Sequence, residues 1–357
     1  MLCERFCFFL LIANLVLFLN ERCGYTGTAA VRAYGLFLSA CYLTPLLGGR
    51  LCDGILGLGR TTMLGVVVQF AGLLLLTFHS ASMIPLALLL ISFGSGLFKA
   101  GTQTLLASLP VRTETERNRL FSTIYVVINV AALIAPLIAG VVQRDGQYAR
   151  WFALLLIFAL CGIAALLPLR SEATSHMQRQ NSELPYPTKR RNARMALILL
   201  AGALFAAAFV QSHSTLLLFV RDHVARQVGG FTIPVVWFAA APGAMVLLFS
   251  PLLSTVFLLL RKSHREPSTL QKLALGMIIT ALAFLPIWVA ANQAKAHHLV
   301  SPTWVLSCFS LLAIGEILVG GLAPAEIACI APADHRGQWM SYWFVAIAIG
   351  NAIGGCL

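Results

Sequence analysis

Residues 83–109 read MIPLALLLISFGSGLFKAGTQTLLASL, an apolar run in which Lys99 is the only charged residue. A helix needs roughly 20 apolar residues to cross about 30 Å of bilayer hydrocarbon, and this run has them. A full charge at that depth is costly, and it persists where it pairs with another charge or lines a pathway for solutes. The run therefore predicts a membrane-spanning helix with a functional residue inside it.

Similar apolar runs recur along the whole chain. Of its 357 residues, 59% are hydrophobic and 11% are charged, which does not fit a soluble domain. We find eleven runs of spanning length: 2–20, 31–50, 61–78, 83–109, 119–142, 149–168, 195–220, 231–260, 270–292, 302–326 and 338–357. The sequence thus predicts an all-α polytopic membrane protein with about eleven transmembrane helices.

The longest polar interruption, 170–194, separates six of these runs from the remaining five. It contains Pro185 and Pro187 and ends in the basic sequence KRRNAR, a composition typical of a linker. We therefore expect an N-terminal six-helix bundle over 1–169 and an incomplete C-terminal bundle over 195–357. In this interpretation the first helix is cut short and a twelfth is missing.

The net charge of +12 reflects membrane topology. If the loop 21–30 lies outside, sixteen Lys and Arg residues fall on the inward side and seven on the outward side. This asymmetry is the positive-inside bias of membrane proteins, so the charge does not indicate a nucleic-acid partner. We expect a multi-pass protein of the plasma (inner) membrane, with the linker 170–194 in the cytoplasm.

Metal and enzyme chemistry find little support in the sequence. The nine cysteines are scattered without a CxxC pair, which favours packing roles over a metal or disulfide framework. His297 and His298 form the only adjacent histidine pair, and no acidic residue lies near them in the sequence. A membrane enzyme would need clustered histidines or carboxylates at a membrane face, so we expect neither an enzyme nor a metal site.

Several separated segments carry a resemblance to a known family. Residues 48–60, GGRLCDGILGLGR, resemble the GGxLADxxLGRxR signature of the major facilitator superfamily. Within that superfamily, the chain resembles the proton-coupled oligopeptide transporter (POT) family at four places: CERFCFF (3–9) resembles the end of ExxERFxYYG, LFK (97–99) resembles part of GxFKPN, IYVVINV (124–130) resembles FYxxINxGS, and GEI (315–317) with Ala331-Pro332 and Trp343-Phe344 resembles GEL…AP…WF.

This resemblance implies a two-bundle fold and proton-coupled symport of di- or tripeptides, or related small zwitterionic solutes, by alternating access. A zwitterion needs a cation for its carboxylate, an anion for its ammonium group and amides for its backbone. By the resemblance, Arg5 and Lys99 lie near the peptide C-terminus, and Asn129 and Glu316 face its N-terminus. We expect a monomer in the lipid bilayer, with no cofactor except the proton as coupling ion.

The candidate residues fall into three groups. The expected substrate-binding residues are Arg5, Lys99, Asn129, Glu316, Tyr125 and Trp343. The expected proton-coupling residues are Glu4, Glu316 and Lys99, and those for gating or topology are Asp53 and Arg60. Packing roles stay open for Tyr125 and Trp343, and helix–helix hydrogen bonding stays open for Asn129. Glu326 is expected to meet a cytosolic base or water.

Departures from the family pattern leave a second function open. The first motif glutamate falls at Met1, two tyrosines are Phe8 and Phe9, and an arginine and a glutamate are Ile12 and Val210. Loss of the last two is consistent with loss of an ion pair as a unit, because removing one partner strands a charge. The alternative is a transport-inactive, peptide-transporter-like membrane scaffold or sensor. The retained Lys99, Asn129 and Glu316 argue against it.

Overall fold

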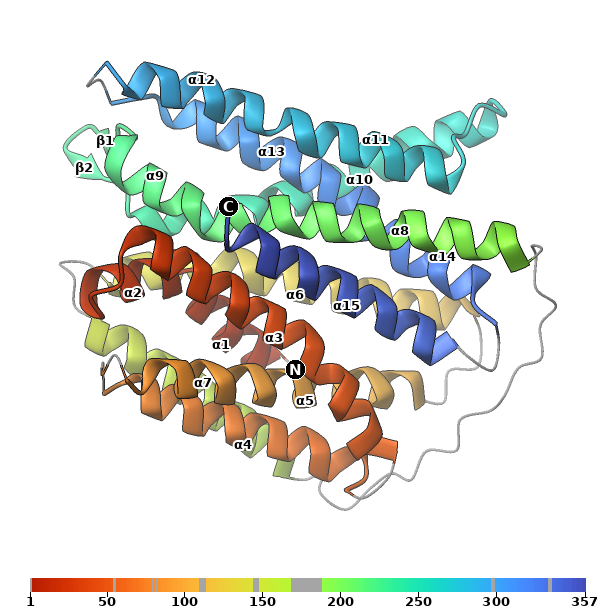
Figure 1. Ribbon diagram of the computed structural model, residues 1–357, viewed down its shortest axis with the longest axis horizontal. Helices are drawn as coiled ribbons and strands as arrows, with labels where there is room; N and C mark the ends of the chain where they lie inside the picture. The colour runs from red at the N-terminus through yellow and green to blue at the C-terminus, as the bar shows by residue number, and fades with distance from the viewer. Residues whose placement is uncertain are drawn as a thin grey trace. The chain divides into compact units, whose positions relative to one another are not determined.

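The computed structural model describes residues 2–53, 56–78, 80, 82–108, 114–143, 148–167, 188–296, 299–332 and 336–357. The side chains of 52–53, 103–108, 114–122, 125, 188–190 and 336–337 are outside this description. The chain forms two compact units, Met1–Gln178 and Arg179–Leu357, and both consist mainly of long helices (Figure 1).

The helices of the first unit are α1 (Leu2–Ile12), α2 (Leu15–Arg22), α3 (Gly27–Asp53), α4 (Leu58–Leu76), α5 (Ile84–Ser108), α6 (Glu114–Val142) and α7 (Tyr148–Leu166). Helix α5 packs against α3 and α4, and α1 packs against α6 and α7. Small residues allow the close approach of α5. A Cβ atom on Gly94 would overlap the backbone of Gln69 in α4, and one on Gly96 would overlap Thr44 in α3.

A bend of 44° separates α1 from α2. At the bend the amide of Asn14 donates to the carbonyl of Leu11, so the carbonyl of Leu10 lacks its ordinary helical partner. The indole Nε1 of Trp151 in α7 donates to that carbonyl at 3.0 Å. A side-chain donor thus satisfies a backbone group that the bend exposes, which water cannot do in a bilayer.

The second unit contains α8 (Thr188–Phe209), the 3-10 helix η3 (Val210–His213), α9 (Thr215–His223), η4 (Val235–Ala240) and α10 (Ala241–Lys262). It continues with α11 (Thr269–Leu282), α12 (Phe284–Ala294), α13 (Pro302–Val319), α14 (Leu322–Ile330) and α15 (Arg336–Gly354). Helix α13 packs against α10, α11 and α12, while α8 packs against α15. Between α9 and η4, the strands β1 (Gln227–Val228) and β2 (Phe231–Thr232) form an antiparallel hairpin.

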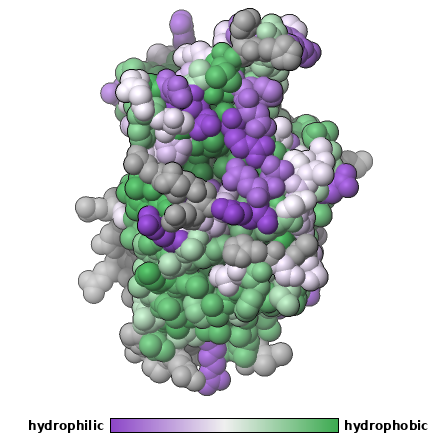
Figure 2. Space-filling model, turned by 90° about the vertical axis from the view of Figure 1, so that its left-hand side faces the viewer, coloured by the Kyte–Doolittle hydropathy of each residue, from purple (hydrophilic) through white to green (hydrophobic). Residues whose placement is uncertain are grey.

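The hairpin belongs to a polar end of this unit. Its turn consists of Gly229 and Gly230, which adopt φ values of 54° and 83°, a conformation that glycine reaches without strain. Figure 2 views the end that is on the left of Figure 1, and hydrophilic residues gather in its upper part, where Figure 1 places the end of α9 and the hairpin. Asp222 and Gln227 are exposed there. These polar segments connect spans without entering them.

Ten of the eleven predicted spans coincide with a helix or with consecutive helices; the other, 231–260, was predicted to begin too early, because Phe231 and Thr232 form strand β2 and the helical part starts with η4 at Val235. Within the described residues, eight helices are long and apolar enough to cross a membrane, and a ninth span results if the bent pair α1–α2 is one span. Several spans are interrupted, which the hydropathy did not predict: 195–220 by η3, 270–292 between α11 and α12, and 302–326 between α13 and α14. Of the predicted linker, 170–187 lies outside the described residues and 188–194 belongs to α8. The domain bounds stay a prediction.

Candidate functional site

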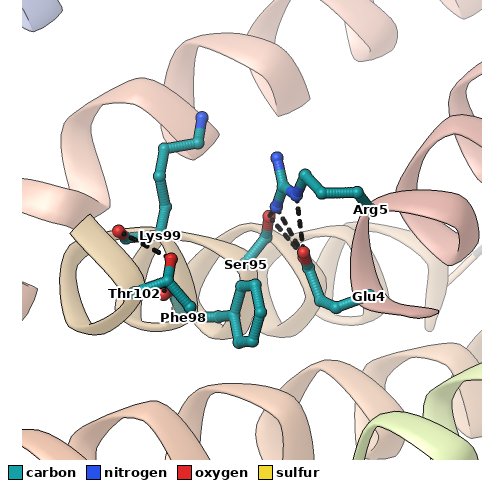
Figure 3. A network of polar contacts seen from close by, with 6 residues as sticks. All are labelled: Glu4, Arg5, Ser95, Phe98, Lys99 and Thr102. Carbon is teal, nitrogen blue, oxygen red and sulfur yellow. Dashed lines mark hydrogen bonds and ion pairs between the residues drawn. The ribbon is translucent and has the colours of Figure 1, made fainter. Parts of the chain in front are cut away.

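Glu4 and Arg5 form a buried ion pair in α1 (Figure 3). Arg5 donates from Nε to one carboxylate oxygen of Glu4 and from Nη2 to the other, both at 2.6 Å. Ser95 of α5 joins the pair: its Oγ accepts from Arg5 Nη2 at 3.2 Å and donates to Glu4 at 3.4 Å. The two charged residues are 2% and 8% exposed. The bidentate geometry and the serine hydroxyl offset the cost of removing both charges from water.

Aromatic rings enclose the guanidinium group of Arg5. Its Cζ lies 4.9 Å from the ring centroid of Phe8 in α1 and 5.9 Å from that of Phe98 in α5. The faces of these rings carry partial negative charge and attract a cation. Arg5 is therefore held on one side by Glu4 and Ser95 and on the other by apolar surface.

Lys99 lies one helical turn beyond Ser95 on α5, and in Figure 3 its side chain extends to the same side of α5 as the guanidinium of Arg5. Its ammonium group lies 4.3 Å from the ring centroid of Tyr42 in α3. No carboxylate of the described residues lies within ion-pair distance of it. The first unit therefore presents a self-neutralised pair and, beside it, a cation whose described contact is an aromatic ring.

The α6 candidates lie on the helix that packs against α1. Asn129 is buried, with 6% of its surface exposed. Tyr125 precedes it by one helical turn in α6, and its side chain lies outside the described residues.

Glu316 lies near the end of α13 in the second unit and is partly exposed. Its backbone carbonyl accepts hydrogen bonds from the amides of Gly320 and Gly321, where α13 ends and α14 begins. No Lys or Arg of the described residues lies within 4.0 Å of its carboxylate. The predicted anion thus sits one turn before a break in its span.

The remaining candidates have other surroundings. The ring of Trp343 in α15 is buried and packs against Gly202 of α8, where a Cβ atom would overlap it. Arg60 is exposed in the first turn of α4, and the side chain of Asp53 lies outside the described residues. His297 and His298 also lie outside them. Glu326 of α14 accepts a hydrogen bond from Arg194 of α8. Arg194 is a basic residue near the predicted inner end of its helix, so Glu326 meets a base, as the sequence predicted.

Two members of the first-unit cluster were missed by sequence reasoning. Ser95 is uncharged, but its spacing of four residues from Lys99 places both on one face of a helix, and that signal was available. Tyr42 lies in α3 without a motif or charge to mark it, so only the packing of α3 on α5 identifies it.

Comparison with known proteins points to one family. The sequence profile of the POT family matches residues 59–170 and 170–357. The chain is 26% identical to the peptide transporter YePEPT of Yersinia enterocolitica subsp. palearctica, over 99% of this chain and 84% of the relative. It is also 26% identical to dipeptide and tripeptide permease B of Yersinia enterocolitica serotype O:8, over 99% and 83%.

Solved structures share the fold. A crystal structure of a peptide transporter POT in complex with sulfate matches with a TM-score of 0.85 at 21% identity, covering 99% of this chain and 85% of that one. A POT family transporter in complex with a thioalcohol-conjugated peptide matches with a TM-score of 0.87 at 19% identity, covering 99% and 87%. The predicted fold class, an all-α polytopic membrane protein with the major-facilitator architecture, is confirmed.

Proposed function

Because the chain belongs to the POT family, whose members are membrane transporters, we propose that it carries di- and tripeptides, or related small zwitterionic solutes, together with protons. The prediction that it is not an enzyme is confirmed by this membership. We further propose that it works by alternating access, as a monomer in the plasma membrane with the linker 170–194 in the cytoplasm. The printed names of its relatives, peptide transporter and dipeptide and tripeptide permease, support the substrate class.

The observation that carries the proposal is the ammonium group of Lys99, which lies over the ring of Tyr42 and pairs with no described carboxylate. A cation in such surroundings gains strongly from a bound anion. In the proposal Lys99 binds the peptide carboxylate, Glu316 binds the peptide ammonium group, and Asn129 bonds to the peptide backbone. Tyr125 and Trp343 would contribute wall surface.

Glu4 is the proposed proton carrier in the first unit. Its carboxylate accepts hydrogen bonds from the guanidinium of Arg5 and from the hydroxyl of Ser95. A substrate carboxylate that reaches Arg5 competes for the same donors. Glu4 then loses its partner in buried surroundings, where the neutral acid is favoured over the carboxylate. A proton taken up by Glu4 thus compensates the charge of the arriving substrate.

Gradient-driven uptake tests this coupling. We expect the purified protein in liposomes to accumulate labelled dialanine when the interior is alkaline, and a protonophore to abolish the accumulation. Glu4→Gln should lose gradient-driven accumulation and keep exchange of internal for external peptide, because exchange needs no net proton transfer. The exchange signal also shows that the variant is folded. Asp222→Asn, an exposed carboxylate paired with Arg221, is the matched control and should keep both activities.

Two results would contradict the proposal. Full gradient-driven accumulation by Glu4→Gln would remove Glu4 from proton coupling. Absence of both accumulation and exchange in the unmodified protein would favour the scaffold or sensor alternative, which the departures at Phe8, Phe9 and Val210 left open.

A further inference from the structure

The connection between α10 and α11, at the upper right of Figure 1, carries a dense group of basic residues. Arg261 and Lys262 end α10, and His264 and Arg265 follow directly. All four residues are exposed. We call residues 261–266 the basic turn.

Backbone hydrogen bonds fix the basic turn. The amide of Arg265 donates to the carbonyl of Leu260 at 2.9 Å, and that of His264 donates to Arg261 at 3.1 Å. This pair of bonds is a Schellman motif, in which the residue after the cap adopts a left-handed conformation. His264 occupies that position with φ of 54°, and it is the only non-glycine residue with positive φ in the described parts of the chain. Glycine would fit there without strain, so the choice of a histidine places another polar nitrogen-bearing side chain in the turn.

The following helix is equally fixed. Ser268 caps α11, accepting from the amide of Gln271, while the Gln271 side chain accepts from the amide of Ser268. The cations of the basic turn therefore project from a short connection with a defined backbone. A ligand that binds them has little backbone entropy to remove.

The basic turn contains one acidic residue, Glu266, which is paired with a lysine of the following helix. Lys272 of α11 donates to Glu266 at 2.6 Å, and its ammonium group lies 4.2 Å from the ring centroid of Phe257. This hydrogen bond, together with the charges of Lys272 and Arg261, lowers the pKa of the Glu266 carboxyl below its ordinary value. The side chains of Lys262 and Arg265 form no ion pair with the described residues. The side chain of Arg261 is 78% exposed, and its Nε lies 3.9 Å from a carboxylate oxygen of Glu266.

The surroundings of the turn are those of a membrane surface. The span that precedes it ends at Lys262, and the next begins at Thr269. Within two turns of the end of α10, the side chains of Val256, Leu258 and Leu259 are about half exposed, at 48%, 53% and 59%. Exposed cations therefore lie directly beside exposed aliphatic side chains, at the depth where phospholipid headgroups meet their acyl chains.

We propose that the basic turn binds the phosphate headgroup of an anionic membrane phospholipid. Arg261, Lys262 and Arg265 contact the phosphate group and its neighbours, and the acyl chains lie along the exposed aliphatic face at the end of α10. The positive-inside bias needs only charge on one side of the membrane. A headgroup site requires two further properties. The protein should bind some lipids more tightly than others, and this difference should depend on Arg261, Lys262 and Arg265.

Native mass spectrometry of the full chain in detergent measures this preference. We expect phosphatidylglycerol to bind more tightly than phosphatidylcholine with the same acyl chains. Arg261→Gln/Arg265→Gln should weaken phosphatidylglycerol binding roughly thirtyfold, since each surface cation contributes about a fivefold factor. The control Arg32→Gln/Lys295→Gln also removes two exposed cations and should change binding less than threefold. Lys262→Gln, which touches no described charged side chain, is the milder second variant, with an expected loss of about fivefold.

The proposal is overturned if the unmodified protein binds both lipids equally, or if the control variant loses as much affinity as the basic-turn variant. It is also overturned if soluble glycerol phosphate displaces the lipid at equal concentration, because the site would then recognise a free phosphate. Both lipid comparison and competition use the unmodified protein, so they give an answer even where a variant fails to fold.

Discussion

Replacing Lys99 by methionine separates a binding role from a structural role, because methionine keeps an unbranched chain and removes the charge. The ammonium group contacts the Tyr42 ring at 4.3 Å, a cation–π contact of about 0.5–2 kcal/mol. Holding an unpaired cation at membrane depth costs about 2.5–3.5 kcal/mol. Removing both terms leaves a net gain, so we expect the free energy of unfolding to rise by about 0.5–3 kcal/mol.

Substrate binding should change in the opposite direction. Truncating one partner of a buried charge pair costs about 2–5 kcal/mol, so Lys99→Met should bind a dipeptide roughly 30- to 5,000-fold more weakly. Binding of labelled dialanine and thermal unfolding are measured on the same preparation. Lys295→Met, an exposed lysine after α12, is the matched control and should change neither quantity. The reasoning is refuted if Lys99→Met keeps near-normal affinity, or if it lowers the melting temperature by several degrees.

Two further predictions concern stability. Glu326→Gln breaks the pair with Arg194, in which the side chain of Glu326 is 11% exposed and that of Arg194 is 16% exposed. We expect the free energy of unfolding to fall by about 2 kcal/mol, less than for a fully buried pair. The exchanged pair Arg194→Glu/Glu326→Arg should recover most of this stability, and equal losses in both variants would contradict a direct interaction. Gly94→Ala places a Cβ atom against the backbone of α4 and should cost about 3 kcal/mol. Gly49→Ala, whose Cβ meets nothing within 4 Å, is its control, and a wild-type melting temperature for Gly94→Ala would show that the α4–α5 contact is looser than described.

The spans and the charged part of the site could be predicted because both depend on the cost of polarity in a bilayer. Apolar length marked each span, and a charge inside such a run marked Glu4, Arg5, Lys99 and Glu316. The pairing of Glu4 with Arg5 needed the structure, because adjacent residues on a helix do not ordinarily face each other. The uncharged neighbour Tyr42 could not be predicted from the sequence either, because only the packing of α3 on α5 brings it to Lys99.

The breaks within spans show why local signals were insufficient. Pro286 has no amide hydrogen for the carbonyl of Leu282, and α11 ends at that residue. Yet Pro45, Pro136 and Pro251 lie inside α3, α6 and α10, which continue through them. Whether a proline ends a helix depends on the neighbours that satisfy the freed carbonyl, and those neighbours come from distant parts of the chain.

The pairing of Glu4 with Arg5 also bears on how the first helix enters the membrane during synthesis. The two charges are neighbours in the sequence, so they can pair once the first turns of α1 have formed, before any later helix exists. The segment then crosses into lipid as a neutral unit, at a lower cost than two separate ions. Ser95 joins only after α5 has been made. Lys99 has no such local partner, so its helix depends on the Tyr42 ring of α3, a span that has already been synthesised and inserted.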